Sequence, residues 1–317
     1  MLSRVADSLY WVGRYLERAE HTARLLDVNL SLMLDQSPEA AEHRWERLQR
    51  SLEWRYHGDL NAYSIAEALI LDPANPSSIQ ASIASARENA RQVREQISSE
   101  MWEHLNRLSL QVKQASMSVM WANQSHDFLH GVIKEGVQLF QGITNATLSR
   151  NESWYWLRLG QFMERASATI SVLDSYFMHG TIPRDLTQVA YLEWVALLKS
   201  CTSFEAYCNV YTADIRPERI AEFLLLNEES PRSVRFCADR ISEAIQAIAK
   251  HTTTRRADRP KRLAGRLQAL LDYGQVDEII AEGLHQYLAS ILQQCNQIDQ
   301  AIYQSFISYP IETALAS

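Results

Sequence analysis

Apolar residues recur at helical spacing along most of the chain. The stretch from residue 4 to about 35 predicts a long first helix, capped by Ser3, whose apolar side carries Ala6, Leu9, Leu16, Ala23, Leu26 and Leu30. Similar spacing predicts further helices around Trp45, over 65–71, from 77 past 108, over 125–149, around Glu164 and over 276–308. No segment shows the alternation of a strand. The pattern predicts an all-α fold.

Part of this pattern occurs twice in the sequence. Residues 12–19 read Val-Gly-Arg-Tyr-Leu-Glu-Arg-Ala, and residues 159–166 read Leu-Gly-Gln-Phe-Met-Glu-Arg-Ala. Residues 66–72 match 221–227 in the same way. Such recurrence indicates an internal duplication. We therefore expect a multi-helix bundle built from two duplicated halves, 1–150 and 151–317, that pack around a pseudo-twofold axis as one body, because no flexible linker separates them.

Composition narrows the protein class. Gly (10) and Pro (8) are scarce among 317 residues, which favours long helices. The net charge of −7 argues against a nucleic-acid binder, which needs a basic face. The four cysteines include no CxxC pair, and neither a signal peptide nor an apolar run of about 20 residues is found. We expect a cytoplasmic protein that does not enter the membrane.

The first helix carries the richest polar chemistry. Residues three and four apart share a helix face, which brings Tyr10, Arg14, Glu17, His21 and Arg24 onto one stripe beside Arg18. The arginines of such a cluster suit a carboxylate- or phosphate-bearing ligand, while Glu17 suits an ammonium group or a metal, or acts as a general base. A solvated helix face is the plainer interpretation of the same stripe.

A structural interpretation stands beside the ligand site. Glu17-Arg18 and Glu164-Arg165 occupy equivalent places in the two copies. Across a pseudo-dyad, Glu17 can pair with Arg165, and Glu164 with Arg18. A buried reciprocal ion pair of this kind would fix the register of the halves more than it would stabilise them.

The two copies differ in what surrounds the Glu-Arg pair. The second copy replaces Tyr10, Arg14, His21 and Arg24 by Leu157, Gln161, Ala168 and Ser171. Any functional site is therefore expected to be built mainly by the first helix.

Other catalytic and metal-binding signals are weak. His126 and His130 have the i, i+4 spacing of zinc ligands, but Asp127 replaces the glutamate of HExxH and no third ligand is evident. No Gly-rich phosphate loop and no recognisable nucleophile setting is present. We expect no metal and no cofactor.

Residues 1–20, from Met1-Leu2-Ser3 through Gly13 to Glu17-Arg18-Ala19-Glu20, resemble the opening motif of the bacterial alpha-E domain family, and the resemblance extends along essentially the whole chain. Members of that family are typically encoded beside, or fused to, a circularly permuted ATP-grasp ligase, often near a transglutaminase-like protease gene. The resemblance implies a helical partner subunit that binds the ligase, an amino-acid or peptide substrate, or both.

Two alternatives to the partner subunit remain. One is an enzyme in its own right, with Glu17 as general base or metal ligand and the arginines as an anion clamp. The other is a homodimeric scaffold that uses a tryptophan-rich surface.

Overall fold

The computed structural model describes residues 1–32, 38–59, 61–122, 125–178, 188–212, 214–250 and 257–308. Within these ranges every regular element is helical and no strand occurs. The first part of the chain contains α1 Ser3–Leu32, α2 Pro38–Ser51, α3 Ala62–Ile70, α4 Ile79–Gln92, the 3-10 turn η2 Arg94–Gln96, α5 Ser99–Lys113, α6 Met117–Ala122, α7 Ser125–Asp127, the π-helix η3 Phe128–Lys134 and α8 Glu135–Thr147.

The remainder of the chain continues the all-α fold. It contains α9 Glu152–Phe177, α10 Gln188–Ser200, α11 Phe204–Tyr211, α12 Pro217–Leu226, α13 Val234–Lys250, α14 Asp258–Asp272, α15 Val276–Glu282, α16 Leu284–Ile302 and the π-helix η5 Tyr303–Ile307. The all-α class predicted from the sequence is confirmed.

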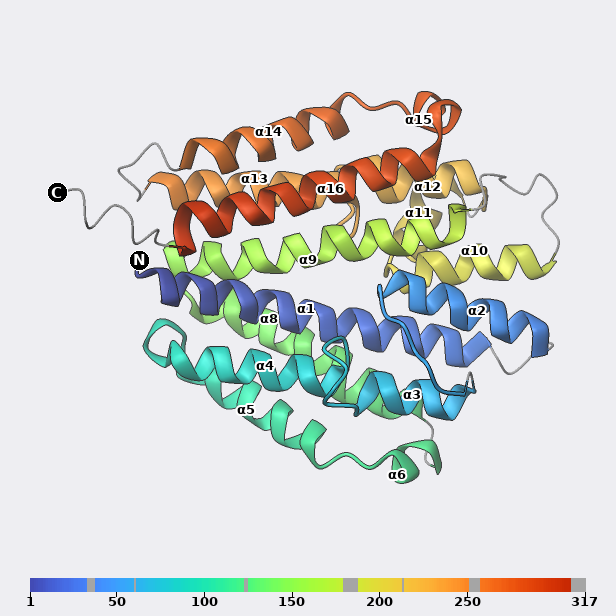
Figure 1. Cartoon of the computed structure of the whole chain (residues 1–317), viewed down its shortest axis with the longest axis horizontal. Coiled ribbons are helices and arrows are strands. Elements are labelled where there is room, and N and C mark those ends of the chain that lie inside the picture. Colours follow the sequence, from blue (N-terminus) through green and yellow to red (C-terminus); the bar gives the residue numbers. More distant parts are fainter. Residues whose placement is uncertain are drawn as a thin grey trace.

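Helices α1 and α9 lie side by side at the centre of the molecule (Figure 1). Gly13 of α1 faces the backbone of Leu157, and Gly160 of α9 faces the backbone of Tyr10. A Cβ atom on either glycine would lie closer to the opposing carbonyl oxygen than real Cβ atoms approach anything. The glycine that both copies of the motif retain therefore permits the close contact of the two central helices.

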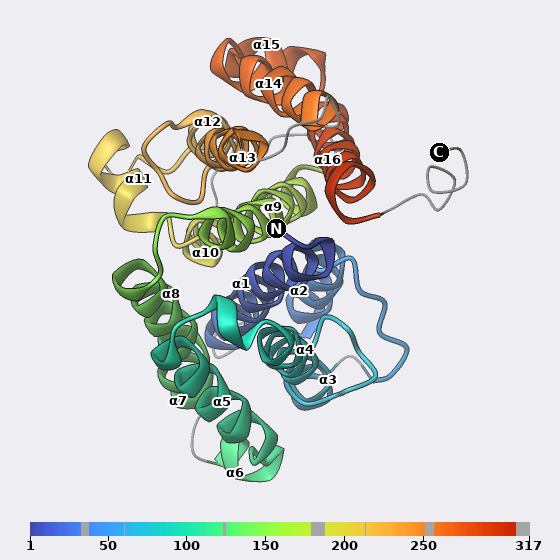
Figure 2. The ribbon, with the colours of Figure 1, turned by 90° about the vertical axis from the view of Figure 1, so that its left-hand side faces the viewer.

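The outer helices repeat one arrangement on each side of this central pair (Figure 2). α4 packs on α1 and α5 on α4, while α13 packs on α9 and α14 on α13. The π-helix η3 packs on α1, as α16 packs on α9. Each central helix is thus covered by the helices that follow it in the sequence.

The two sides also interlock. α2 packs against α9, and α10 packs against α1. Asn151, whose side chain accepts hydrogen bonds from the backbone N–H groups of Ser153 and Trp154, caps α9 at the expected boundary. The division into halves 1–150 and 151–317, and the duplication behind it, stay predictions.

Local backbone geometry matches between the two sides. Glu53 after α2 and Thr202 after α10 both adopt a left-handed conformation, with φ of 49° and 52°. Thr22 of α1 donates to the carbonyl of Ser77, and Thr169 of α9 donates to that of Arg232. The loop residues Ser77 and Arg232 therefore occupy corresponding places next to the central helices.

Two long predicted helices are interrupted. The prediction of one helix over 276–308 is wrong, because Gly283, with φ of 113°, separates α15 from α16. The helix predicted from 77 past 108 ends at Gln92. The Ser98 side chain accepts from the N–H of Met101 and starts α5.

With one exception, the tryptophans are divided between the core and half-buried positions. Trp45, Trp156 and Trp194 are buried in the core, and Trp121 is the one exposed tryptophan of the eight. The homodimeric scaffold that uses a tryptophan-rich surface stays a prediction. Within the described part of the chain, none of the helices combines the length and apolar character that crossing a bilayer requires.

Candidate functional site

The carboxylate of Glu17 lies fully buried between α1 and α9. Arg165 donates to both of its oxygens, from Nε at 2.7 Å and from Nη2 at 2.8 Å. Arg232 donates from Nη1 at 2.6 Å, and Gln161 from Nε2 at 3.2 Å. Burial alone would raise the pKa of Glu17, but the charges of Arg165 and Arg232 hold it well below its usual range.

A second layer of charge closes this region. Arg24 donates to Glu20 Oε1 at 2.6 Å, and Arg232 donates to the same oxygen at 3.0 Å. These two acids, the guanidinium groups around them and the amide of Gln161 are here called the Glu17 cluster. Its members are Glu17, Glu20, Arg24, Gln161, Arg165 and Arg232. The surroundings of Glu17 favour structural pairing over a general base or metal ligand, because arginine donors already occupy both of its oxygens.

Glu164 makes the corresponding contacts from α9. Arg18 donates from Nε to Oε1 at 2.6 Å and from Nη2 to Oε2 at 3.2 Å, and Arg14 donates from Nε to Oε2 at 2.7 Å. Burial again raises the pKa of Glu164, and the charges of Arg14 and Arg18 lower it below its ordinary value. Glu164, Arg14 and Arg18 are here called the Glu164 cluster. The structure thus contains both reciprocal Glu-Arg pairs that the repeated motif predicts.

The two clusters differ in how the space next to them is filled. Small residues replace the charged ones beside Glu164, because the positions of Glu20, His21, Arg24 and Arg232 correspond to Ser167, Ala168, Ser171 and Ser77. A cavity of about 320 Å³ remains, lined by these small residues and by Arg14, Arg18, His21 and Asn296 among others. This volume reaches the range of small-molecule binding sites.

His21 faces this cavity from α1. It is 6% exposed, and its Nε2 is buried without a hydrogen-bond partner among the described residues. Burial and, next, the charge of Arg232 lower the pKa of His21 to about 4. A neutral imidazole with an unused ring nitrogen therefore lines the cavity, and such a buried polar atom calls for a partner.

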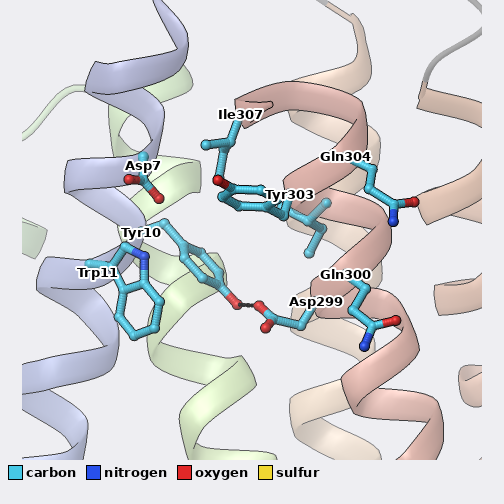
Figure 3. Close-up of a pocket in the computed structure, with 9 residues that line it drawn as sticks. Asp7, Tyr10, Trp11, Asp299, Gln300, Tyr303, Gln304 and Ile307 are labelled. Atoms are coloured by element: carbon cyan, nitrogen blue, oxygen red, sulfur yellow. Dashed lines mark hydrogen bonds between the residues drawn. The ribbon is translucent and has the colours of Figure 1, made fainter. Parts of the chain in front are cut away.

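Tyr10 and Arg14 meet Asp299 of α16. Tyr10 donates its hydroxyl proton to Asp299 Oδ1 at 2.5 Å, and Arg14 Nη1 donates to the same atom at 3.3 Å. Figure 3 shows the Tyr10–Asp299 bond at the edge of a second cavity, of about 190 Å³, between α1 and α16. Asp299 and Arg232 had no signal in the sequence, because they reach the motif from 285 and 215 residues away.

The stripe on the first helix is therefore divided in space. Tyr10, Glu17, His21 and Arg24 are buried, so the solvated-face interpretation is wrong for them. Arg24 belongs to the Glu17 cluster and does not line the cavity at Glu164.

The two histidines with zinc-ligand spacing have other partners. His126 Nδ1 lies 2.7 Å from Asp27, which also accepts from Lys134 at 2.6 Å, and His130 lies 3.3 Å from Glu135. Within the described ranges, no group of three or more potential ligands is arranged to hold a metal ion.

Comparisons with known proteins place the chain in a family. No solved structure matches it. Uncharacterized proteins of Mycobacterium bovis and of Mycobacterium tuberculosis are 24% and 23% identical to it over 314 residues, which cover 91% of this chain. The chain spans about a third (35%) of the length of these relatives. Residues 1–307 match the model of the Alpha-E family, a predicted alpha-helical domain with a conserved ER motif. This chain belongs to the Alpha-E family.

Proposed function

We propose that this chain is a helical partner domain of an ATP-grasp-dependent peptide or amide ligation system, and that it binds an amino-acid or peptide substrate in the cavity beside Glu164. The observation that carries the proposal is the unequal filling of the two clusters. Charged side chains fill the space next to Glu17, whereas serines and an alanine leave the space next to Glu164 open.

The cavity offers groups of both signs, as a zwitterionic substrate requires. Arg18, whose side chain is 23% exposed, can turn donors toward a substrate carboxylate. Glu53 is exposed at the rim and suits an ammonium group. Ser167 and Ser171 supply neutral hydrogen-bonding groups, and the neutral imidazole of His21 lines the same wall. No catalytic set accompanies them in the described residues, so the domain holds the substrate and the ligase performs the bond formation.

The ligase itself is inferred from the family and from the length of the relatives. Because the matched region makes up 35% of each mycobacterial relative, most of each relative lies outside this domain. A domain of this kind is suited to work beside an enzyme, in the same chain or in a separate one. The resemblance to the alpha-E domain family supports an ATP-grasp ligase as that enzyme.

Titration calorimetry with free alanine tests the cavity. Ser77→Arg places at this position the residue that stands at the corresponding position beside Glu17, and it is expected to abolish binding by filling the cavity. Ser77→Ala, at the same position, leaves the space open and retains binding. If alanine binds the Ser77→Arg protein as it binds the unmodified protein, the Glu164 cavity is not the substrate site.

Co-expression with an ATP-grasp ligase from the same genome tests the partner role. We expect the two proteins to purify together and ligase activity to rise when this protein is added. Absence of co-purification, together with unchanged ligase activity, would sink the partner role whatever the calorimetry shows.

A further inference from the structure

The cavity beside Glu164 has neighbours on both sides along α16. A neighbouring cavity of about 210 Å³ shares Glu53, Ser171 and Leu292 with it. A third cavity, of about 590 Å³, shares Arg50 and Glu53 with that neighbour. On the other side lies the 190 Å³ cavity of Figure 3, which shares no lining residue with the Glu164 cavity and is separated from it by the contacts of Asp299 with Tyr10 and Arg14.

Helix α16 and its extension η5 run along this row of four cavities, here called the α16 groove. Residues 288 to 307 contribute to three of its four cavities, opposite α1 at one end and α9 and the end of α2 at the other. At about 1.5 Å per residue, those positions span on the order of 29 Å. An extended polypeptide advances about 3.4 Å per residue, so the groove matches about eight residues of extended chain. A single amino acid would leave most of this length empty.

The end of the groove shown in Figure 3 is acidic and aromatic. Asp7 and Asp299 supply carboxylates, and Trp11 and Tyr303 supply rings, while no lysine or arginine is among the described residues that line this cavity. Oδ1 of Asp7 is buried without a hydrogen-bond partner in the described part of the chain. A carboxylate beside aromatic faces is the environment that recognises an ammonium or guanidinium group.

The electrostatics of Asp7 agree with a missing cation. Burial raises its pKa above the ordinary value, against the opposing effect of a hydrogen bond from Trp11. Asp299 differs, since Arg14 already lies 3.3 Å from it. Asp7 is therefore the carboxylate in this cavity that still needs a counter-charge.

We propose that the α16 groove binds an extended peptide whose cationic side chain enters the cavity between Asp7, Trp11 and Tyr303. This inference rests on the proposed function, of which it names the ligand class. The peptide backbone then lies across the serines beside Glu164, whose hydroxyl groups can bond its amide groups.

Titration calorimetry with two probes separates this inference from the proposed function. One probe is free alanine, and the other is an N-acetylated octapeptide of one lysine followed by alternating glycine and serine. We expect the octapeptide to bind at least tenfold more tightly than alanine. If alanine binds and the octapeptide binds no more tightly, the extended groove is overturned and the proposed cavity stands. If neither binds, both fall.

Exchange of the lysine for norleucine tests the cationic end. The norleucine octapeptide is expected to bind at least tenfold more weakly, and Asp7→Asn should weaken the lysine peptide to the same level while leaving alanine binding unchanged. Glu100→Gln, which changes the net charge equally on the exposed start of α5, is the matched control and should alter neither affinity. If Asp7→Asn weakens the lysine and norleucine peptides equally, Asp7 does not recognise the cation.

Discussion

The Glu17 and Glu164 clusters form around the same repeated motif, in which Gly, Glu, Arg and Ala are identical, but the two glutamates have different environments. Both glutamates accept from two arginines, yet only Glu17 is sealed, by Arg232 from the loop before α13 and by Glu20 and Arg24 behind it. The corresponding positions around Glu164 are serines and an alanine, which leave room for a ligand. The comparison teaches that the Glu-Arg pairs common to both copies join the two central helices. The residues that differ between the copies determine whether the space beside each pair is filled or open.

Removal of the two carboxylate charges should separate the clusters most clearly. Glu17→Gln leaves Arg165 and Arg232 buried without a full counter-charge and should lower the free energy of unfolding by about 3–5 kcal/mol. Glu164→Gln should cost roughly 2 kcal/mol, because Arg14 retains Asp299 and Arg18 reaches solvent through the cavity. Urea denaturation measures both.

The ranking of these two variants is the informative result. Equal losses of unfolding free energy would show that exposure of Arg18 to the cavity does not reduce the cost of removing the Glu164 charge. The two clusters would then not differ in the way proposed. A larger loss for Glu164→Gln would mean that the Glu164 cluster contributes more to the stability of the fold than the Glu17 cluster does.

Gly13 and Gly160 test the close contact of α1 and α9, to which both copies of the motif contribute a glycine. Gly13→Ala and Gly160→Ala each force a Cβ atom into the opposing backbone and should cost about 1–3 kcal/mol or somewhat more, by similar amounts. Gly142→Ala is the matched control, because nothing lies within 4 Å of its Cβ position in α8, and it should stabilise the protein by about 0.5–1 kcal/mol. Thermal unfolding measures all three, and a harmless Gly160→Ala would refute the close helix contact.

The sequence predicted the framework better than the site. Helical spacing gave the all-α class, and the repeated motif pointed to the pairing of Glu17 with Arg165 and of Glu164 with Arg18. Arg232 could not be found, because its place beside Glu17 depends on how the loop before α13 folds back onto α1. Local spacing carries no information about such a contact.

The unequal copies were visible in the sequence but pointed to a different place. The loss of charge at Ala168 and Ser171 predicts that a functional site is built mainly by the first helix. The structure shows that small residues on α9 create the space into which Arg14, Arg18 and His21 of α1 face. A small residue in place of a large one removes a functional group and also leaves a space. Whether that space becomes a cavity depends on how α9 packs against α1, which the sequence does not show.

His21 distinguishes the surroundings of the two clusters most specifically, since its counterpart in α9 is Ala168. Its pKa is about 4 in the folded protein against 6.5 for the ordinary side chain, so the unfolded state binds more protons between these values. Stability should therefore fall as the pH drops from about 6.5 toward 4. By pH 5 the loss should reach about 2 kcal/mol, at about 1.4 kcal/mol per pH unit.

The pH dependence of the free energy of unfolding, measured in urea at pH 7, 6 and 5, isolates this contribution. His21→Ala gives α1 the residue of α9, and it should remove most of the slope between pH 6.5 and 5 even if it lowers stability at every pH. The glutamates interfere little, because carboxylates with the ordinary pKa of 4.5 are still mostly ionised in the unfolded state at pH 5, and the folded-state pKa values are lower still. An unchanged slope in His21→Ala would place the acid-sensitive group elsewhere, and a slope of the opposite sign in the unmodified protein would mean that His21 is charged in the folded state and already has an anionic partner.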